Sequence, residues 1–385
     1  MAASHSEHEP AHGTLRRRWK GVCVAAAARL ASRPRLTLAQ IQARGPRRVL
    51  IVRQHNQMGD MVCATPALRA LRRCFPSAEI VLVTAPVNHE VVAHNPHVDR
   101  VLLFDRTVWR DPVRLWRFMR ALRRFRPELA VVLNSVSFSV TSAWIAAVSG
   151  APMIMGGDSR PYGWDLSRHL FSLEMPSRPD MDRHAVLHNL APLEAVGVAS
   201  AGLETVVVPT EREGAAAAAL AARLPAGQEL VLLHPGAGKR ENRWPPARFA
   251  AIARRAAAAG ARVVVLHGPA DGQTLAAFRA ALAEEPDAAV RARVVVASTL
   301  AMGVAAALLQ RSDRFLCNDT GIMHVAGAVG APTLALFGPT DPRLWKPLSP
   351  LVCALRGESN RLDALGVETV WSALLALPSR QDGVS

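Results

Sequence analysis

Residues 315–324 read FLCNDTGIMH, an apolar run that passes directly into a helix of small residues. The run ends at Asn318 and Asp319, and Thr320 and Gly321 begin the helix. Because the first backbone N–H groups of a helix have no partners within it, the junction predicts a strand-to-helix turn that receives a diphosphate. Asp and Thr also cap helices that bind nothing, so an ordinary capped helix is the alternative.

Strands and helices alternate on both sides of this turn. In the second half of the chain, apolar strands are predicted at 230–234, 263–267, 294–296, 314–317 and 333–337, with helices at 245–259, 271–284 and 300–310 between them. Continuous apolar strands that alternate with helices are typical of a parallel sheet covered on both faces.

The first half of the chain repeats the pattern. Strands are predicted at 47–53, 79–83, 101–104 and 129–133, and helices at 61–74, 112–125 and 184–196. The period is lost over 161–183, and the chain crosses to the second half near 206–210. We therefore predict an α/β protein in which two Rossmann-like parallel-sheet domains face a central cleft.

The predicted domains divide the 385 residues into four parts. A basic leader covers 1–45, an acceptor-side domain 46–205 and a nucleotide-sugar donor domain 206–350. A C-terminal segment, 351–385, is expected to pack back on the N-terminal domain. The chain is long enough for two cores of ordinary size.

Basic residues outnumber acidic ones in this sequence. Lys and Arg total 46 against 31 Asp and Glu, a net charge of +15. Such a charge attracts polyanions, which include nucleic acid, anionic lipid and phosphorylated glycolipid. No aromatic RNA-binding motif or zinc-finger spacing occurs, so nucleic acid is not predicted as a partner.

The five cysteines are scattered, which argues against a disulfide framework and favours a reducing compartment.

The leader holds the basic cluster 16–20 and a short Ala-rich run at 22–28. That run is too short for a signal peptide and is closely followed by further arginines. No uninterrupted apolar stretch of the sequence reaches the length of a membrane-spanning helix. We predict a cytoplasmic protein whose leader is disordered or lies on an anionic membrane surface.

Asp60 is the first candidate for chemistry. It follows the strand at 47–53, at the start of a helix, so its carboxylate is expected to project into the cleft. A carboxylate there can remove the proton from an acceptor hydroxyl, and a helix N-cap is the alternative role. Two arginines, Arg53 and Arg69, are candidates for contact with an acidic acceptor.

A second group of candidates follows the strand at 230–234. Small residues let a diphosphate approach the backbone, while cations supply charge; this group comprises His234, Gly236, Gly238, Lys239, Arg240 and Arg243. The spacing matches neither a Walker loop nor a dinucleotide fingerprint, which disfavours an NAD-dependent oxidoreductase. Asp271, after the next strand, is a candidate for binding the ribose or base of a nucleotide and also for a helix cap.

His184 and His188 are four residues apart and could share a metal ion, but no third ligand is evident, and no metal site is predicted.

The motifs together resemble the heptosyltransferase family, the ADP-heptose:lipopolysaccharide glycosyltransferases. The resemblance runs in order from about Val49 to Trp345 and rests on five segments: 49–60, 65–71, 234–236, 243–245 and 318–324. It implies a GT-B fold and an inverting, metal-independent transfer without a cofactor. It also implies an anionic inner-core lipopolysaccharide acceptor at the cytoplasmic face of the inner membrane.

Site roles follow from the same resemblance. Asp60 corresponds to the catalytic base, and the donor's diphosphate and sugar contacts correspond to Asp319, Thr320, Gly321 and His324. The chain differs from the family at Asn242, where a lysine usually meets the donor phosphate, and at Asp271, where glutamate is common. A related transferase with another nucleotide-sugar, a sugar-nucleotide epimerase and a non-catalytic binding subunit are the alternatives.

Overall fold

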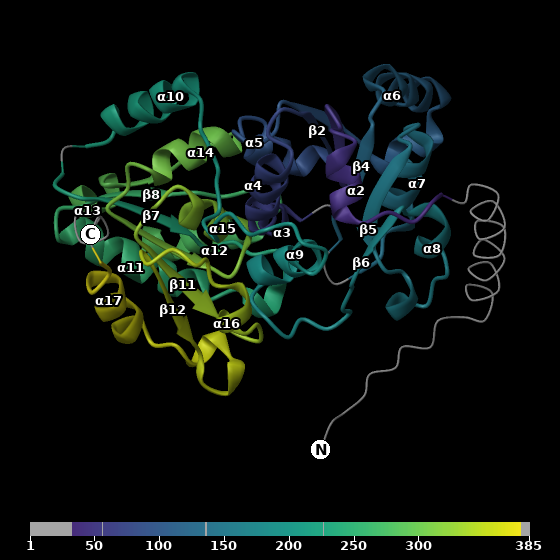
Figure 1. Ribbon diagram of the computed structural model, residues 1–385. Helices are drawn as coiled ribbons and strands as arrows, with labels where there is room; N and C mark the ends of the chain where they lie inside the picture. Colours follow the sequence, from purple (N-terminus) through teal and green to yellow (C-terminus); the bar gives the residue numbers. More distant parts are fainter. Residues whose placement is uncertain (1–32, 56, 135–136, 226, 379–385) are drawn as a thin grey trace.

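The computed structural model describes residues 33–378 except 56, 135–136 and 226. Two lobes lie side by side, each built on a parallel sheet with helices packed around it (Figure 1). The predicted α/β class with two parallel-sheet domains is confirmed.

The first sheet has six strands in the order β3-β2-β1-β4-β5-β6. They are β1 (Arg48–Arg53), β2 (Glu79–Thr84), β3 (Arg100–Leu103), β4 (Leu129–Val132), β5 (Met153–Gly157) and β6 (Leu173–Met175). The helices of this half are α2 (Leu38–Ala43), α3 (Met58–Cys63), α4 (Thr65–Cys74), α5 (His89–Val92), α6 (Pro112–Phe125), α7 (Val140–Val148), α8 (Ser167–Leu170) and α9 (Ala185–Glu194). The sequence did not predict β5 and β6, which are short and, in β5, end in two glycines.

The second sheet also has six strands, in the order β12-β11-β10-β7-β8-β9. They are β7 (Leu230–His234), β8 (Arg262–Val265), β9 (Val294–Val296), β10 (Arg314–Asn318), β11 (Thr333–Phe337) and β12 (Val352–Arg356). Its helices are α10 (Glu211–Ala222), α11 (Pro246–Ala258), α12 (Gly272–Ala283), α13 (Ala288–Ala292), α14 (Met302–Leu309), α15 (Gly321–Ala328), α16 (Pro342–Trp345) and α17 (Val367–Leu375). In each sheet the central strands β1 and β7 end at loops that hold candidate residues.

The described part of the C-terminal segment, residues 351–378, packs on the second domain and not, as expected, on the N-terminal domain. β12 pairs in parallel with β11 and extends the second sheet. α17 buries Val370 and Leu374 in the core of the same domain, with Val231 and Leu316. The apolar face of α17 therefore completes the domain that precedes it in the chain.

Part of the predicted leader belongs to the first domain. Thr37 and Gln40 form a capping box at the start of α2, and Leu38 and Ile41 of that helix are buried in the core. The cluster 16–20 and the run 22–28 lie outside the described residues. Within the described part of the chain, no helix combines the length and apolarity needed to cross a membrane.

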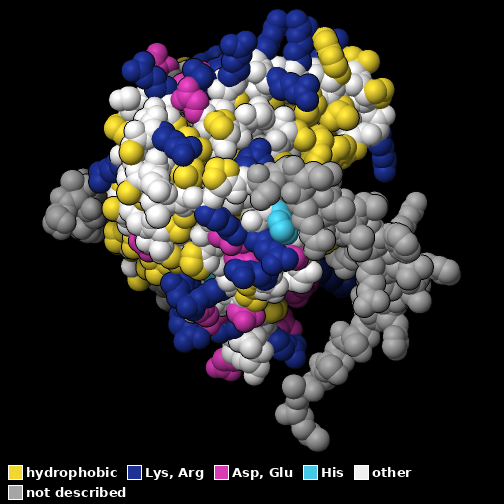
Figure 2. Space-filling model, turned by 45° about the vertical axis from the view of Figure 1, so that its right-hand side comes forward, with side chains coloured by type: hydrophobic (Ala, Val, Ile, Leu, Met, Phe, Trp, Pro, Cys, Tyr) yellow, Lys and Arg dark blue, Asp and Glu magenta, His cyan; other side chains and the backbone are white. Residues whose placement is uncertain are grey.

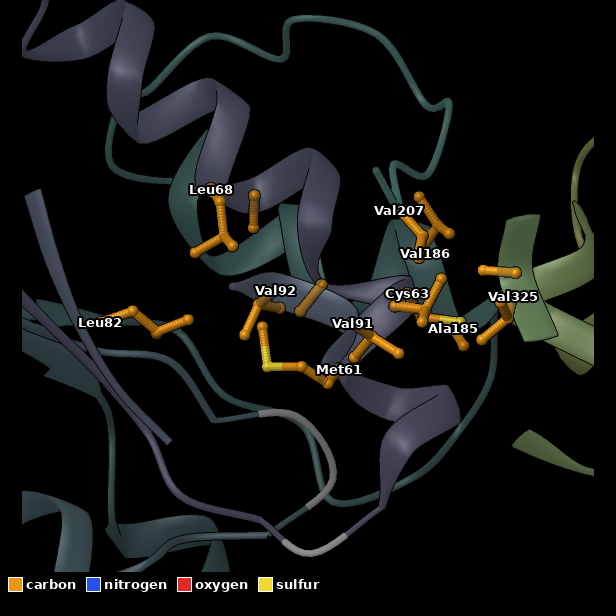
Figure 3. Packing of buried hydrophobic residues seen from close by; sticks show 14 of the residues in the cluster. Met61, Cys63, Leu68, Leu82, Val91, Val92, Ala185, Val186, Val207 and Val325 are labelled. Carbon is orange, nitrogen blue, oxygen red and sulfur yellow. The ribbon is translucent and has the colours of Figure 1, made fainter. Parts of the chain in front are cut away.

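An apolar core continues from one lobe into the other. Val325 of α15 packs in the same cluster as Cys63 of α3 and Ala185 of α9, and Figure 3 shows their side chains close together where the two ribbons meet. The residues between α9 and α10 connect the lobes, and this connection is fixed to α4 because Val206 donates its N–H to the hydroxyl of Thr65. The two carboxyl edges are thus held facing each other across packed helices.

Candidate functional site

Asp60 lies in the first turn of α3, where the helix N-terminus favours a negative charge. The N-cap position belongs to Gln57, so Asp60 does not cap the helix. Its side chain is half-buried, and within the described part of the chain no donor is hydrogen-bonded to its carboxylate. Burial raises the pKa of this carboxyl above its ordinary value, and the nearby charge of Arg53 opposes the rise. A carboxylate with this environment is suited to accept a proton from a hydroxyl.

Arg53 stands directly behind Asp60. It is the last residue of β1, it is 1% exposed, and its Nη2 donates to the backbone carbonyl of Asp60 at 3.1 Å. Its Nη1 is buried without a hydrogen-bond partner among the described residues. The guanidinium therefore supports the backbone of Asp60 from inside the protein. A contact with the acceptor, as expected from the sequence, would require an exposed guanidinium.

The N-termini of α3 and α15 meet across the interface through two glycines. A Cβ on Gly59 would lie 2.7 Å from Cδ2 of His324, and a Cβ on Gly321 would lie 2.9 Å from Cε of Met58. The Nδ1 of His324 is 3.3 Å from the sulfur of Cys63. Burial lowers the pKa of His324 to about 4 and raises that of the Cys63 thiol to about 12, so both are neutral near pH 7. His324 thus joins the donor-side helix to the helix of Asp60.

The donor-side turn has the predicted geometry. β10 ends at Asn318, and Thr320 is the N-cap of α15 with extended backbone and no side-chain cap bond. The carboxylate of Asp319 accepts from Nδ2 of Asn242 at 3.3 Å and from the hydroxyl of Thr340 at 2.6 Å. Asn242 therefore orients Asp319, while the N–H groups of Gly321 and Ile322 at the start of α15 have no backbone partner among the described residues.

Asn318 organises the loops of this edge, a role that sequence analysis did not assign to it. Its side chain is fully buried; Nδ2 donates to the carbonyls of Pro235 and Gly236 at 2.9 and 3.2 Å, and Oδ1 accepts from the N–H of Trp244 at 3.0 Å. One amide thus connects β10 to the loop after β7 and to the start of α11. An Asn placed between an apolar strand and Asp319 was the available signal.

Gly236 permits a close approach of Asp271. A Cβ on Gly236 would lie 2.2 Å from Oδ1 of Asp271. The Oδ2 of Asp271 accepts from the N–H of Gly268 at 2.7 Å and is 3.5 Å from Nε2 of His234. Asp271 occupies the N-cap position of α12 but makes no side-chain bond to that helix. The carboxylate instead fastens the loop after β8 to the loop after β7.

The basic side chains after β7 differ in whether a hydrogen bond within the protein holds them. Arg243 donates from Nε to the carbonyl of Ala237 at 2.8 Å, which folds its side chain onto the loop. Lys239 is exposed and close enough to Asp319 to lower the pKa of that carboxyl, which burial raises. Of these two side chains, Lys239 is the one available to an anion beside the α15 N-terminus.

A cavity of about 270 Å³ lies between the two domains at this point. Its wall includes Met58 from the first domain and, from the second, His234, Gly238, His267, Asp271, Ser298, Thr299, Leu300 and Thr320. His267 is held in this wall by a contact between its Nε2 and the carbonyl of Ala297, at 2.9 Å. Ser298, Thr299 and His267 were not among the predicted residues, since they occupy loops without a motif.

The side chains of Arg69 and His184 contact other groups of the protein and do not line the cavity. Arg69 forms an ion pair with Glu204 at 2.8 Å and also donates to Ala201, so it fixes the connection between the domains. Nε2 of His184 is 2.7 Å from the carbonyl of Lys346, and its Nδ1 accepts from Val186. Within the described ranges, no three His, Cys, Asp or Glu side chains cluster as metal ligands.

Known proteins resemble this chain over most of its length. The sequence model of glycosyltransferase family 9 (heptosyltransferase) matches residues 115–370. The chain is 30% identical to lipopolysaccharide heptosyltransferase 1 of Pseudomonas aeruginosa over 308 residues, which cover 77% of this chain and 79% of that protein. It is 24% identical to lipopolysaccharide heptosyltransferase 3 of Escherichia coli, over 76% of this chain and 84% of that protein.

Solved structures share the fold. Heptosyltransferase II of Escherichia coli superposes with a TM-score of 0.71 at 21% identity and covers 86% of this chain and 98% of its own. An Escherichia coli heptosyltransferase solved with ADP gives a TM-score of 0.68 at 20% identity, over 85% and 99% of the two chains. The GT-B type of the predicted α/β fold is confirmed. The chain therefore belongs to glycosyltransferase family 9, the heptosyltransferases, and is a glycosyltransferase.

Proposed function

We propose that this protein transfers heptose from ADP-heptose to an inner-core lipopolysaccharide acceptor, with inversion at the anomeric carbon and without a metal ion. The relatives named above are lipopolysaccharide heptosyltransferases, and one solved neighbour holds ADP. The observation that carries the proposal is the cavity between Met58 and Thr320, with Asp60 on one domain and the α15 N-terminus on the other.

The two domains would supply complementary chemistry beside this cavity. Asp60 would take the proton of the acceptor hydroxyl as its oxygen attacks the anomeric carbon. The N–H groups at the start of α15 and the ammonium of Lys239 would stabilise the negative charge on the leaving ADP. In the proposed reaction the base and the leaving group lie on opposite sides of the anomeric carbon, and a single displacement of this kind would invert the configuration.

Protein groups, rather than a metal ion, would balance the negative charge of the leaving ADP. The helix terminus and Lys239 supply positive character, while the carboxylate of Asp319 is already engaged by Asn242 and Thr340. The transfer rate is therefore expected to be the same in the presence of a chelator. The acceptor would be met at the cytoplasmic face of the inner membrane.

Release of ADP from ADP-heptose by the purified full chain tests the function. With a Kdo-lipid A type acceptor, release should be acceptor-dependent and the product should have the inverted linkage by NMR. A panel of other nucleotide-sugars is run beside it. Turnover of another donor, with none of ADP-heptose, would replace the donor assignment, and release without acceptor would contradict the transfer.

Lys239→Met is expected to raise the KM for the donor about tenfold to a hundredfold, because a charge-assisted contact with phosphate contributes roughly 1.5–3 kcal/mol. Steady-state kinetics with a varied donor measures the change. Arg240→Met is the matched control, since Arg240 is the next residue and is also exposed. Lys239→Arg should recover most of the affinity. Equal losses in Arg240→Met and Lys239→Met would show that only the overall charge of the loop matters.

A further inference from the structure

The outer face of α6 combines exposed arginines with exposed apolar side chains. α6 lies at the upper right in Figure 1, and dark-blue basic side chains with yellow hydrophobic ones cover the top of the molecule in Figure 2. The helix buries Phe118, Leu122 and Phe125 against the first sheet. Its opposite side presents one stripe, at i, i+3, i+4, i+7 and i+11, of Val113, Trp116, Arg117, Arg120 and Arg124. We call this stripe the α6 face.

The α6 face carries charge that no described residue neutralises through an ion pair. No acidic residue occurs from 112 to 126, and five arginines lie within α6 itself. Arg114 pairs with Asp111 at the start of the helix, whereas Arg117, Arg120 and Arg124 form no ion pair with the described residues. Like charges three or four residues apart destabilise a helix. An external anionic partner would remove this repulsion.

The same face exposes large apolar groups. Trp116 is 57% exposed and Val113 is 56% exposed. Trp109, just before the helix, is 46% exposed. The guanidinium of Arg120 lies over the Trp116 ring, 5.1 Å from its centre, so the exposed indole stacks against an arginine at the surface. A polyanion alone offers nothing to cover these side chains.

Two hollows flank the Trp116 and Arg120 pair. One, of about 410 Å³, is bounded by Arg100, Arg117 and Arg124. The other, of about 480 Å³, is bounded by Arg123, Arg124 and Arg126. Arginine forks bind phosphate oxygens in pairs, so each hollow has the chemistry to receive a phosphate headgroup.

We propose that the α6 face docks the protein on a bilayer that contains anionic phospholipid, with the arginines at the headgroup phosphates and Trp116 and Val113 in the interfacial layer. Charge complementarity and exposed aromatic side chains on one helix face are the two features of interfacial membrane binding. This surface is separate from the cavity between the domains. It rests on the proposed function only in that a glycolipid acceptor would lie in the same membrane.

Vesicle sedimentation of the full chain tests the proposal, with phosphatidylcholine vesicles that contain or lack phosphatidylglycerol. The parent protein should bind only the anionic vesicles, more weakly at high salt. The triple variant R117E/R120E/R124E should bind at least a hundredfold more weakly, since each basic residue near an anionic leaflet contributes roughly fivefold. The matched control is R212E/R223E/R279E, three exposed arginines of the second domain. It makes the same change in net charge and should bind like the parent.

A second variant, Trp116→Phe, tests the depth of docking. Brominated lipid should quench the tryptophan fluorescence of the parent more than that of this variant. Equal vesicle binding by the α6 triple variant and the parent would overturn the proposal, as would equal losses in both triple variants. A preference of the α6 face for a DNA duplex over vesicles would also overturn it and indicate a nucleic-acid surface. Vesicle binding needs neither donor nor acceptor, so its failure leaves the proposed transfer untouched.

Discussion

Asp60→Asn is expected to lower acceptor-dependent transfer by about a thousandfold and to leave ADP binding unchanged. The amide keeps the shape of the carboxylate but cannot take a proton, and general bases contribute roughly 10²–10⁴-fold to rate. Because no donor among the described residues is hydrogen-bonded to the Asp60 carboxylate, the substitution breaks no such bond. Transfer is measured by ADP release and ADP binding by calorimetry. Unchanged turnover would remove Asp60 from the role of base.

The pH dependence of transfer provides a control for the same assignment. Burial raises the pKa of Asp60, so the deprotonated base is lost as pH falls through a value above that of an ordinary Asp. The positive charge of Arg53 lowers this pKa, and removing it in Arg53→Met should shift the acid limb of kcat to higher pH. Arg53→Lys should restore the limb toward its original position. A limb that does not move in Arg53→Met would assign it to another group.

The sequence predicts the central strands of both sheets well because they are apolar and buried on both faces. Strands such as β1 and β10 lie within one or two residues of the predicted ranges. β6 and β12 were missed because each is short or partly exposed and has no continuous apolar run, and β5 was missed although it is buried, because its last two residues are glycines. The single helix expected at 61–74 is two helices, since the chain breaks at Ala64 between α3 and α4.

Several candidate residues were predicted at strand ends, and the structure brings some of them to one place, while their roles stay predictions. Asp60, Thr320 and Gly321 lie at the cavity or its facing helix ends. Arg53 and Arg69 show the limit of this reasoning, because a sequence does not reveal which arginines form hydrogen bonds or ion pairs within the protein. Arg53 bonds the backbone of Asp60, and Arg69 bonds Glu204. The same limit applies to Asn242, whose side chain donates to Asp319, a residue far along the chain.

Asn318→Asp is expected to lower the free energy of unfolding by about 3–5 kcal/mol, the usual cost of an unpaired charge in a buried site. In the parent, Nδ2 of Asn318 donates to the carbonyls of Pro235 and Gly236 at 2.9 and 3.2 Å. The substitution replaces this donor with an oxygen that faces the same two carbonyls. Urea denaturation measures the loss. Affinity for ADP should fall as well, because the loop after β7 forms part of the cavity wall.

Asn360→Asp is the matched control for this change. Asn360 is exposed and has a positive φ of 62°, a conformation that Asp also adopts, so the same chemical substitution should leave stability unchanged. At position 318 the introduced carboxyl is buried, which favours its neutral form, and protonation restores a donor. The loss of stability should therefore be smallest at acidic pH and largest once the carboxyl is ionised. A loss at neutral pH below about 1 kcal/mol, the contribution of one ordinary hydrogen bond, would mean that the Asn318 amide does not hold the three segments together.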